Sequence, residues 1–261
     1  MDIWKPVEIT EDSPYFWRIG RLALWGRIQH DELLVTFRYE EDEAEECRAD
    51  SVSKDSLPDD ATWNRFVLQD REVGIWLRPA LPDRPLVATP EFPLHILPKG
   101  EARFYVSVPL WVQITAGRED FLVLLEIPSR VLSNTWFGDT MTGELCYALN
   151  TRARRNIEKD KTTDHVISCP LTMKNYGNRA LEVQKLSLHA EHLSVYRTDR
   201  GLWANEIRIV YPGGEQPAEV HYLDEVPEWE LLNAARSPAQ KSMLMKGFGF
   251  IKKFALSDQN R

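Results

Sequence analysis

The chain of 261 residues is 43% hydrophobic and 28% charged, close to the globular average, which excludes a disordered chain. Its net charge of −8 excludes a general nucleic-acid binder, which needs an excess of lysine and arginine against the phosphates. Most of the sequence has the period of two that a half-buried strand requires, so we expect a mainly β protein.

Strands are expected where apolar and polar residues alternate. The alternating segments are residues 33–39, 102–108, 110–114 and 207–211, and the more continuously apolar segments 73–77 and 121–127 predict more deeply buried strands. Residues 78–100 contain six prolines and are expected to form an extended crossover between strands or sheets. Pro109 is expected at an edge or a bulge, because proline cannot donate a ladder hydrogen bond.

Residues 40–46 hold six carboxylates in seven positions. A solvated loop is the simpler interpretation of such a run. A Ca²⁺ site is the alternative, although the segment lacks the glycine and asparagine residues that bend a loop around an ion.

The cysteines give the expected compartment. The chain has an odd number of cysteines, Cys47, Cys146 and Cys169, and they are far apart in the sequence. This argues against a disulfide framework and against a thiolate zinc site, and it indicates a reducing compartment. The N-terminus has no basic region followed by an apolar core, as a secretory signal would have. No apolar run approaches the roughly 20 residues of a membrane-spanning helix, so a cytoplasmic protein is expected.

The segment S-N-T-W-F-G-D-T-M-T-G-E-L-C-Y, residues 133–147, is expected to be a long loop between strands, because it is rich in turn-forming residues. The candidate binding residues in it are Asn134, Trp136, Phe137, Asp139 and Glu144. Asp139 and Glu144 could form an acid–base pair or bind a cation. Alternatively, the aromatic residues fill the end of a sandwich and the carboxylates cap turns. We assign no catalytic residue, because no histidine lies near the hydroxyl and thiol groups of this segment.

A polar stretch at residues 152–163 predicts a domain boundary. We expect a β-rich N-terminal domain at residues 1–155 and a smaller immunoglobulin-like β-sandwich at residues 160–224, which opens as strand, turn, strand but lacks the Cys–Trp–Cys signature. The stretch contributes three candidate binding residues, Arg152, Arg154 and Arg155. Their guanidinium groups could hold the phosphate or carboxylate of a small anionic ligand, or belong to a solvated linker.

The motif His189-Ala190-Glu191-His192 contains the imidazole and carboxylate groups that transition metals favour. The apolar residues around it predict a strand, a turn and a second strand. A metal site made by His189, Glu191 and His192 would require this turn to fold His192 back toward the other two. A polar surface turn is the alternative.

The C-terminal tail, residues 225–261, differs in pattern and in charge. Helices are expected to begin at Pro227 and at Ser237, and residues 241–261 hold five basic residues against one acidic residue. We expect this segment to pack on its own body, for example by strand addition, or on a second copy of the chain, which would make a homodimer. The alternatives are a membrane surface and the groove of a partner.

Three segments resemble one known family: S-N-T-W-F-G-D at residues 133–139, G-E-L-C-Y at 143–147 and T-R-A-R-R at 151–155. They look like the domain of unknown function 432, an uncharacterised prokaryotic family, and the resemblance covers most of the chain. It implies a soluble, β-rich prokaryotic protein and brings no activity, cofactor or catalytic residue.

We therefore predict a mainly β fold of two β-sandwich-like, antiparallel domains with a short helical C-terminal tail. The preferred function is a non-enzymatic scaffold that binds a protein partner or a small anionic ligand and needs no cofactor. One alternative is a carboxylate-dependent hydrolase or lyase using Asp139 and Glu144. The other is a peripheral membrane or channel-associated regulator that uses the tail.

Overall fold

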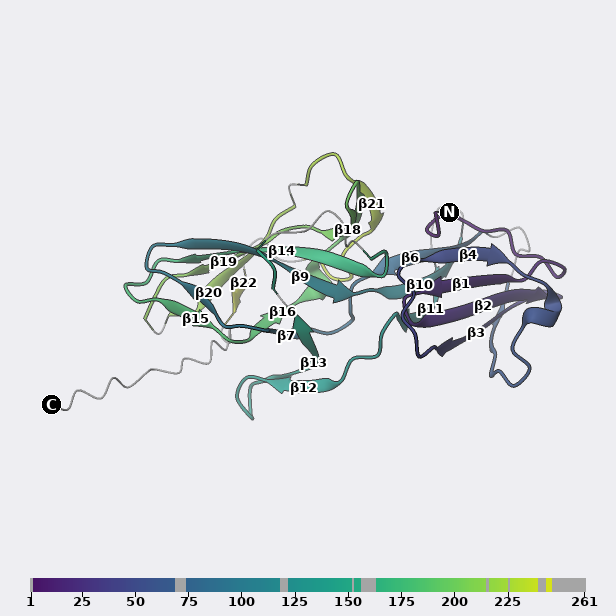
Figure 1. Ribbon diagram of the computed structural model, residues 1–261, viewed down its shortest axis with the longest axis horizontal. Coiled ribbons are helices and arrows are strands. Elements are labelled where there is room, and N and C mark those ends of the chain that lie inside the picture. Colours follow the sequence, from purple (N-terminus) through teal and green to yellow (C-terminus); the bar gives the residue numbers. More distant parts are fainter. Residues whose placement is uncertain are drawn as a thin grey trace.

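The computed structural model describes residues 2–68, 74–117, 122–151, 153–155, 163–214, 216–224, 226–238 and 243–245. The fold is mainly β, as predicted, and its described helical elements are two single turns, η1 (Lys54–Ser56) and η2 (Ala190–His192). The molecule is elongated, with the N-terminal strands at one end and most of the later strands at the other (Figure 1).

The N-terminal end is built on a five-stranded antiparallel sheet. In spatial order its strands are β4 (Arg48–Ser51), β1 (Tyr15–Ile19), β2 (Leu22–Gln29), β3 (Glu32–Tyr39) and β5 (Asn64–Val67). Tight turns join β1 to β2 and β2 to β3, so the neighbours in the sequence are also neighbours in the sheet. The strand predicted at residues 33–39 is confirmed as β3.

A second, three-stranded sheet belongs to the same end, with its strands in the order β11 (Leu122–Pro128), β10 (Trp111–Ala116) and β6 (Ile75–Ala80). Apolar residues of both sheets, such as Leu24 and Leu33 on one and Leu77 and Val112 on the other, are buried in one core cluster. Pro79 lies within β6, which is tolerated because β6 is an edge strand of this sheet.

The chain changes sheets at Leu110. Strand β9 (Glu101–Pro109) pairs with β14 (Val166–Asn175), whereas β10, which begins only two residues after Pro109, pairs with β6 and β11. The predicted alternation of β9 is confirmed, because Ala102, Phe104, Val106 and Val108 are all buried. Pro109 stands at the end of its strand, where the absence of an N–H group ends the ladder without loss.

The proline-rich segment that was predicted as a crossover contributes strands β7 and β8 to two smaller sheets. The four-stranded sheet has the order β12 (Asn134–Phe137), β13 (Glu144–Thr151), β7 (Leu86–Pro90) and β16 (Leu186–Leu188), and β8 (Leu94–Ile96) pairs with β15 (Leu181–Val183). The crossover prediction therefore missed β7 and β8, since prolines at or beyond strand ends leave the ladder between them intact.

The largest sheet has the order β21 (Glu230–Asn233), β17 (Val195–Thr198), β18 (Gly201–Ala204), β14, β19 (Ile207–Tyr211), β20 (Ala218–Tyr222) and β22 (Met243–Met245), with β9 also paired to β14. Strand β14 runs parallel to β18 and to β19, and β13 runs parallel to β7. These parallel pairs depart from the all-antiparallel sheets that were expected.

The sheets do not divide at residues 155–160, where a boundary was expected. Strands β7, β8 and β9 come before that point, yet they pair with β16, β15 and β14, which come after it. A polar stretch is a local signal, whereas these pairings join residues that lie tens of positions apart. Much of the stretch itself, residues 152 and 156–162, lies outside the described residues.

The helix expected from Pro227 is wrong. Residues Glu230–Asn233 form β21, which pairs with the edge of β17. Pairing there satisfies the backbone groups of β17, and this tertiary gain outweighs the local helix-start signal. Most of the second expected helix, and the basic segment beyond residue 245, lie outside the described residues.

Candidate functional site

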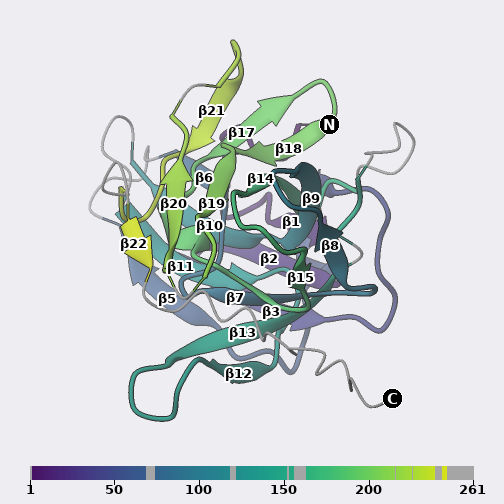
Figure 2. The same ribbon diagram turned by 90° about the vertical axis from the view of Figure 1, so that its left-hand side faces the viewer.

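The segment predicted as a long loop, residues 133–147, is a β-hairpin. Strand β12 pairs with β13 so that Trp136 lies opposite Leu145 and Phe137 opposite Glu144. Phe137 and Cys146 face inward and are buried with Val87 in a small apolar cluster. The hairpin lies at the margin of the molecule in both views (Figures 1 and 2).

The outer face of this hairpin carries exposed apolar side chains. Trp136 is 52% exposed, Leu145 45% and Met141, in the connecting turn, 88%. Of the two aromatic residues singled out in the sequence, Phe137 is therefore an anchor and Trp136 is presented to solvent. The period of two along a strand produces this difference between neighbours.

The indole of Trp136 is held in place by the turn. Its Nε1–H donates to the carbonyl oxygen of Asp139 at 3.1 Å, and the amide of Gly143 donates to the same oxygen at 2.7 Å. A Cβ atom on Gly143 would lie 2.5 Å from the Trp136 Nε1, so only glycine leaves room for the indole. The carboxylate of Asp139 accepts a bond from the Met141 amide at 2.8 Å, which makes it a turn cap.

Glu144 points elsewhere. Its Oε1 accepts a hydrogen bond from the Ser187 hydroxyl at 3.2 Å and lies 3.2 Å from Nε2 of His189. The two carboxylates of the expected acid–base pair thus have different partners, Asp139 in its own turn and Glu144 on the far side of β7. The hairpin is instead joined through Glu144 to the second motif predicted from the sequence.

That second motif forms a cluster beside the turn end of the hairpin, where β13 begins at Glu144. The turn η2 folds His192 back beside His189, and the two rings stack with their centroids 6.2 Å apart. Nδ1 of His189 lies 2.9 Å from Oε1 of Glu191, and Nδ1 of His192 lies 2.6 Å from the carbonyl oxygen of Ser237. Ligand atoms of His189, Glu191 and His192 all lie within 4.8 Å of one another.

The cluster shifts the ionisation of the groups around it. Burial alone would lower the pKa of His189, but the carboxylates of Glu191 and Glu144 outweigh burial and raise it. Burial, with the charges of Glu144 and Glu191, raises the pKa of the Cys146 thiol to about 12. Cys146 is therefore a protonated, buried thiol at neutral pH and not a nucleophile.

Of the three arginines singled out with the hairpin, the structure describes two. Arg152 is outside the described residues, Arg155 is exposed, and the Arg154 carbonyl accepts a bond from the Tyr105 amide at 2.9 Å. Within the described ranges, no hydrogen bond or ion pair joins Arg154 or Arg155 to the side chain of Trp136.

Sequence reasoning missed a hollow of about 370 Å³ that lies near Tyr105. Its walls include Tyr105, Trp203 and Trp229, whose rings are in contact at centroid distances of 5.6 and 5.7 Å, with Arg103 and Arg200 beside them. These residues come from three segments, around residues 105, 203 and 229, so no local pattern marks them.

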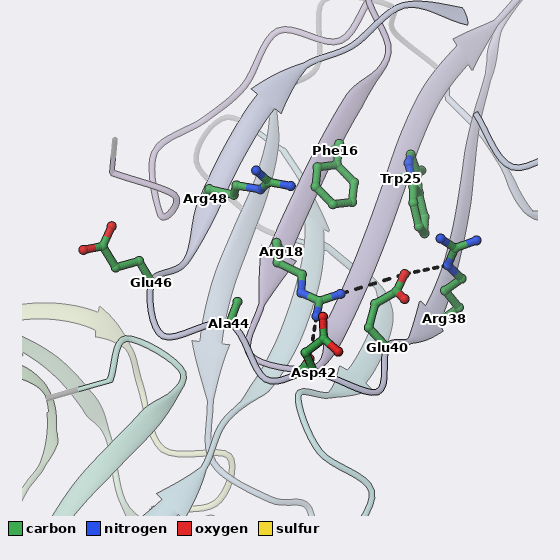
Figure 3. Close-up of a pocket in the computed structure, with 9 residues that line it drawn as sticks. All are labelled: Phe16, Arg18, Trp25, Arg38, Glu40, Asp42, Ala44, Glu46 and Arg48. Carbon is green, nitrogen blue, oxygen red and sulfur yellow. Dashed lines mark hydrogen bonds and ion pairs between the residues drawn. The ribbon is translucent and has the colours of Figure 1, made fainter. Parts of the chain in front are cut away.

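A second missed hollow, of about 540 Å³, lies on the outer face of the N-terminal sheet. Figure 3 shows Arg48, Phe16, Trp25 and Arg38 side by side on β4, β1, β2 and β3. Arg48 lies over the ring of Phe16 and Arg38 over Trp25, at 5.3 and 5.1 Å. Alternation along β1 and β2 could have indicated this face.

The acidic run at residues 40–46 borders this second hollow. The Glu40 carboxylate pairs with Arg38 at 2.7 Å and with Arg18 at 3.8 Å, whereas Glu43 pairs with His165 at 3.1 Å. Glu40 and Glu43 therefore face different basic side chains and do not converge on one point as Ca²⁺ ligands do. Two of the six carboxylates of the run thus act as partners for basic groups.

The whole chain was compared with known proteins. Residues 3–252 match the model of a family described as protein of unknown function, DUF432. No curated protein and no solved structure matches the chain. None of the helical turns in the described part has the length and apolar character of a membrane span. Because the match spans nearly the whole sequence, the chain belongs to the DUF432 family, as the three segments in residues 133–155 predict.

Proposed function

We propose that the protein is a non-enzymatic binding protein and that the outer face of the β12–β13 hairpin contacts a protein partner. The observation that carries the proposal is the indole of Trp136, which is half exposed and yet fixed by its bond to Asp139. A large aromatic side chain that is already ordered loses little entropy on binding, and such residues dominate the energies of protein interfaces.

The neighbours of Trp136 support a protein partner over a small ligand. Leu145 is its cross-strand partner and Met141 lies in the adjoining turn, so the exposed surface is apolar and extends along the hairpin. Methionine adapts to the shape of a partner because its side chain is unbranched. A small anionic ligand would need basic side chains, whereas Met141 and Leu145, which are exposed beside Trp136, are uncharged.

The edge of the hairpin indicates how the partner binds. Strand β12 is the terminal strand of its sheet, and its residues Asn134–Phe137 carry no charge. Free sheet edges are usually protected by lysine, proline or a bulge. An extended segment of the partner can add to this edge as a further strand, with its apolar side chains against Trp136 and Leu145.

The chemical groups nearby favour binding over catalysis. The Asp139 carboxylate caps its turn, Glu144 is bonded to Ser187 and His189, and the raised pKa of Cys146 keeps its thiol protonated. We also place the protein in a reducing, cytoplasmic compartment, a proposal supported by the free thiols of Cys47, Cys146 and Cys169.

The test is affinity capture of partners by the full chain, with the captured proteins identified by mass spectrometry. We expect Trp136→Ala to lose a protein that the wild type captures. Tyr176→Ala is the matched control, because Tyr176 is also a 52% exposed aromatic residue but lies in the turn after β14. Capture of the same proteins in the same amounts by Trp136→Ala and the wild type would refute the proposal.

A further inference from the structure

The sheet order brings Glu144 and the His189 motif together around the start of β7. Strand β7 begins at Leu86, which pairs with Tyr147 on one side and with Leu188 on the other. Glu144 lies three residues before Tyr147, and His189 directly follows Leu188, so both lie beyond the first residue of β7. Their side chains meet there, with Nε2 of His189 3.2 Å from Oε1 of Glu144.

We propose that His189, Glu191 and His192 bind one divalent transition-metal ion of the zinc class, and that Glu144 positions His189 for it. Two imidazoles and a carboxylate are a common set of protein ligands for zinc and leave a fourth coordination position open. The ligand atoms lie within 4.8 Å of one another. Tetrahedral bonds to one zinc ion place the ligand atoms about 3.4 Å from one another. Small side-chain rotations would bring the three ligand atoms to that separation.

The surroundings of His189 call for a cation. Its two ring nitrogens face two carboxylates, Nε2 toward Glu144 at 3.2 Å and Nδ1 toward Glu191 at 2.9 Å. A neutral imidazole has one N–H group and can donate to only one of them, so the other carboxylate is satisfied either by a second proton on the ring or by a metal ion. With the hydrogen on the Glu144 side, Nδ1 and Oε1 of Glu191 both direct lone pairs into the same space, where a metal ion would satisfy both.

Glu144 then has the role of a carboxylate that does not bind the metal itself but accepts a hydrogen bond from one of its histidine ligands, as in many zinc sites. A carboxylate that accepts the second N–H group of a histidine ligand fixes its tautomer and its orientation. Glu144 is itself fixed, because the same Oε1 accepts the Ser187 hydroxyl at 3.2 Å.

His192 is prepared in the same way. Its Nδ1 donates to the carbonyl oxygen of Ser237 at 2.6 Å, which leaves the lone pair on Nε2. The Ser237 amide in turn donates to the Glu191 carbonyl oxygen at 3.0 Å, so the acceptor is held against the turn η2. His192 therefore has one ring nitrogen bonded to an oxygen atom and the other available, whereas the Nδ1 of His189 already lies beside its fellow ligand Glu191.

The third ligand has an unused oxygen. Oε2 of Glu191 is buried and has no hydrogen-bond partner among the described residues. A buried carboxylate oxygen without a partner is costly, and a bound cation would remove this cost. The Tyr222 ring, 5.2 Å from that of His192, forms an apolar wall on one side.

The test is a titration of the full chain with zinc chloride after the metal has been removed with a chelator and the chelator dialysed away. Calorimetry should show one zinc ion per chain. His192→Ala and Glu191→Gln should weaken binding at least roughly tenfold, because each removes a ligand, and Glu144→Gln should weaken it about 10- to 100-fold. His221→Ala is the matched control, since His221 lies beside Glu219 on β20.

Circular dichroism of each variant shows whether it is folded, and Glu191→Gln keeps the size of the side chain in case an alanine variant unfolds. Saturable binding of one ion that the three cluster variants weaken and His221→Ala does not would support the site. Absence of saturable binding, or equal affinity in the wild type and the folded cluster variants, would overturn it. The result is independent of the hairpin proposal, because Trp136→Ala should bind zinc as the wild type does.

Discussion

At the scale of single residues, the position of Trp136 depends on a glycine. Because Gly143 has no Cβ atom, there is space beside it for Nε1 of the indole and for two backbone carbonyl oxygens. Both oxygens would lie 2.6 Å from a Cβ atom placed on Gly143. The sequence shows this glycine only as a turn former, because the close approach depends on the fold of the hairpin.

We expect Gly143→Ala to lower the free energy of unfolding by about 1–3 kcal/mol, since the added methyl group must displace backbone atoms. Urea denaturation measures this change, and tryptophan fluorescence reports the environment of the indole. Met141→Ala, in the same turn but 88% exposed, should leave stability nearly unchanged. Equal stability of Gly143→Ala and the wild type would show that the turn is not tightly closed.

The cysteines give a second prediction at this scale. Burial, with the charge of Asp164, raises the pKa of Cys47 to about 12, and burial with Glu144 raises that of Cys146 to about 12. Cys169 is fully buried and its pKa is also raised. At pH 8 a thiol with such a pKa is a thiolate in only about one molecule in 10⁴.

We therefore expect none of the three thiols to react rapidly with a thiolate-specific reagent at pH 8 in the folded protein, and all three to react in urea. Met141→Cys, which places a thiol at an exposed position, should add one fast-reacting group and is the positive control. A fast-reacting thiol in the native wild type would contradict the burial described here.

At the scale of elements, the segment that begins with β21 fastens the two ends of the molecule. Asn233 donates to the side chain of Gln113 on β10 at 2.8 Å. Arg236 donates through Nε to the Leu81 carbonyl oxygen at 2.9 Å and through Nη1 to Glu126 on β11 at 2.8 Å. The sequence predicts a helix here, because Pro227 and the acidic residues after it form a local helix-start signal. The strand that forms instead is specified by β17, a partner distant in the chain.

Arg236→Ala should lower the free energy of unfolding by about 2–4 kcal/mol, because it leaves partly buried oxygen atoms without their donor. Arg65→Ala is the matched control. The Arg65 pair with Glu32 has similar geometry but its arginine side chain is 65% exposed, so its loss should cost less than about 1 kcal/mol. Thermal or urea unfolding of both variants decides the point, and equal losses would argue against a fastening role for Arg236.

At the scale of the whole molecule, the chain passes repeatedly between two groups of sheets. One group is the five-stranded and three-stranded sheets of the N-terminal end, and the other is the three remaining sheets. Strands β9 and β10 belong to different groups although only Leu110 separates them, and β6 and β11 belong with β10. The core cluster is continuous, including Leu24 of β2 as well as Ile209 of β19. The two ends are therefore joined by several chain connections and share one core.

A fragment of residues 160–224, the second domain expected from the sequence, should not fold alone. The fragment lacks β9, β7 and β8, which pair with its strands β14, β16 and β15. These three strands would expose unpaired backbone N–H and C=O groups and their apolar faces. We expect its amide NMR spectrum to be poorly dispersed, unlike that of the full chain. A dispersed spectrum with cooperative unfolding would show that the fragment is an independent domain.

Local alternation predicts the strands that carry it, as at residues 102–108 and 207–211, because burial of one face leaves a period of two in the sequence. The site was predictable in parts: Trp136, Glu144 and the histidine motif each stand out by residue type. The meeting of Glu144 with His189 was not, since it depends on the parallel pairing of β7 with β13. Pairing of this kind is specified by the whole core.

The central claim is that a protein partner contacts the outer face of the β12–β13 hairpin, and crosslinking in the cell tests it most directly. A photoreactive benzoylphenylalanine at Leu145 lies opposite Trp136, and the same group at Tyr176 is the control. We predict one crosslinked protein from position 145 that is absent from position 176 and is lost when Trp136→Ala is added. Identical crosslinks from the two positions, or none from position 145, would contradict the account.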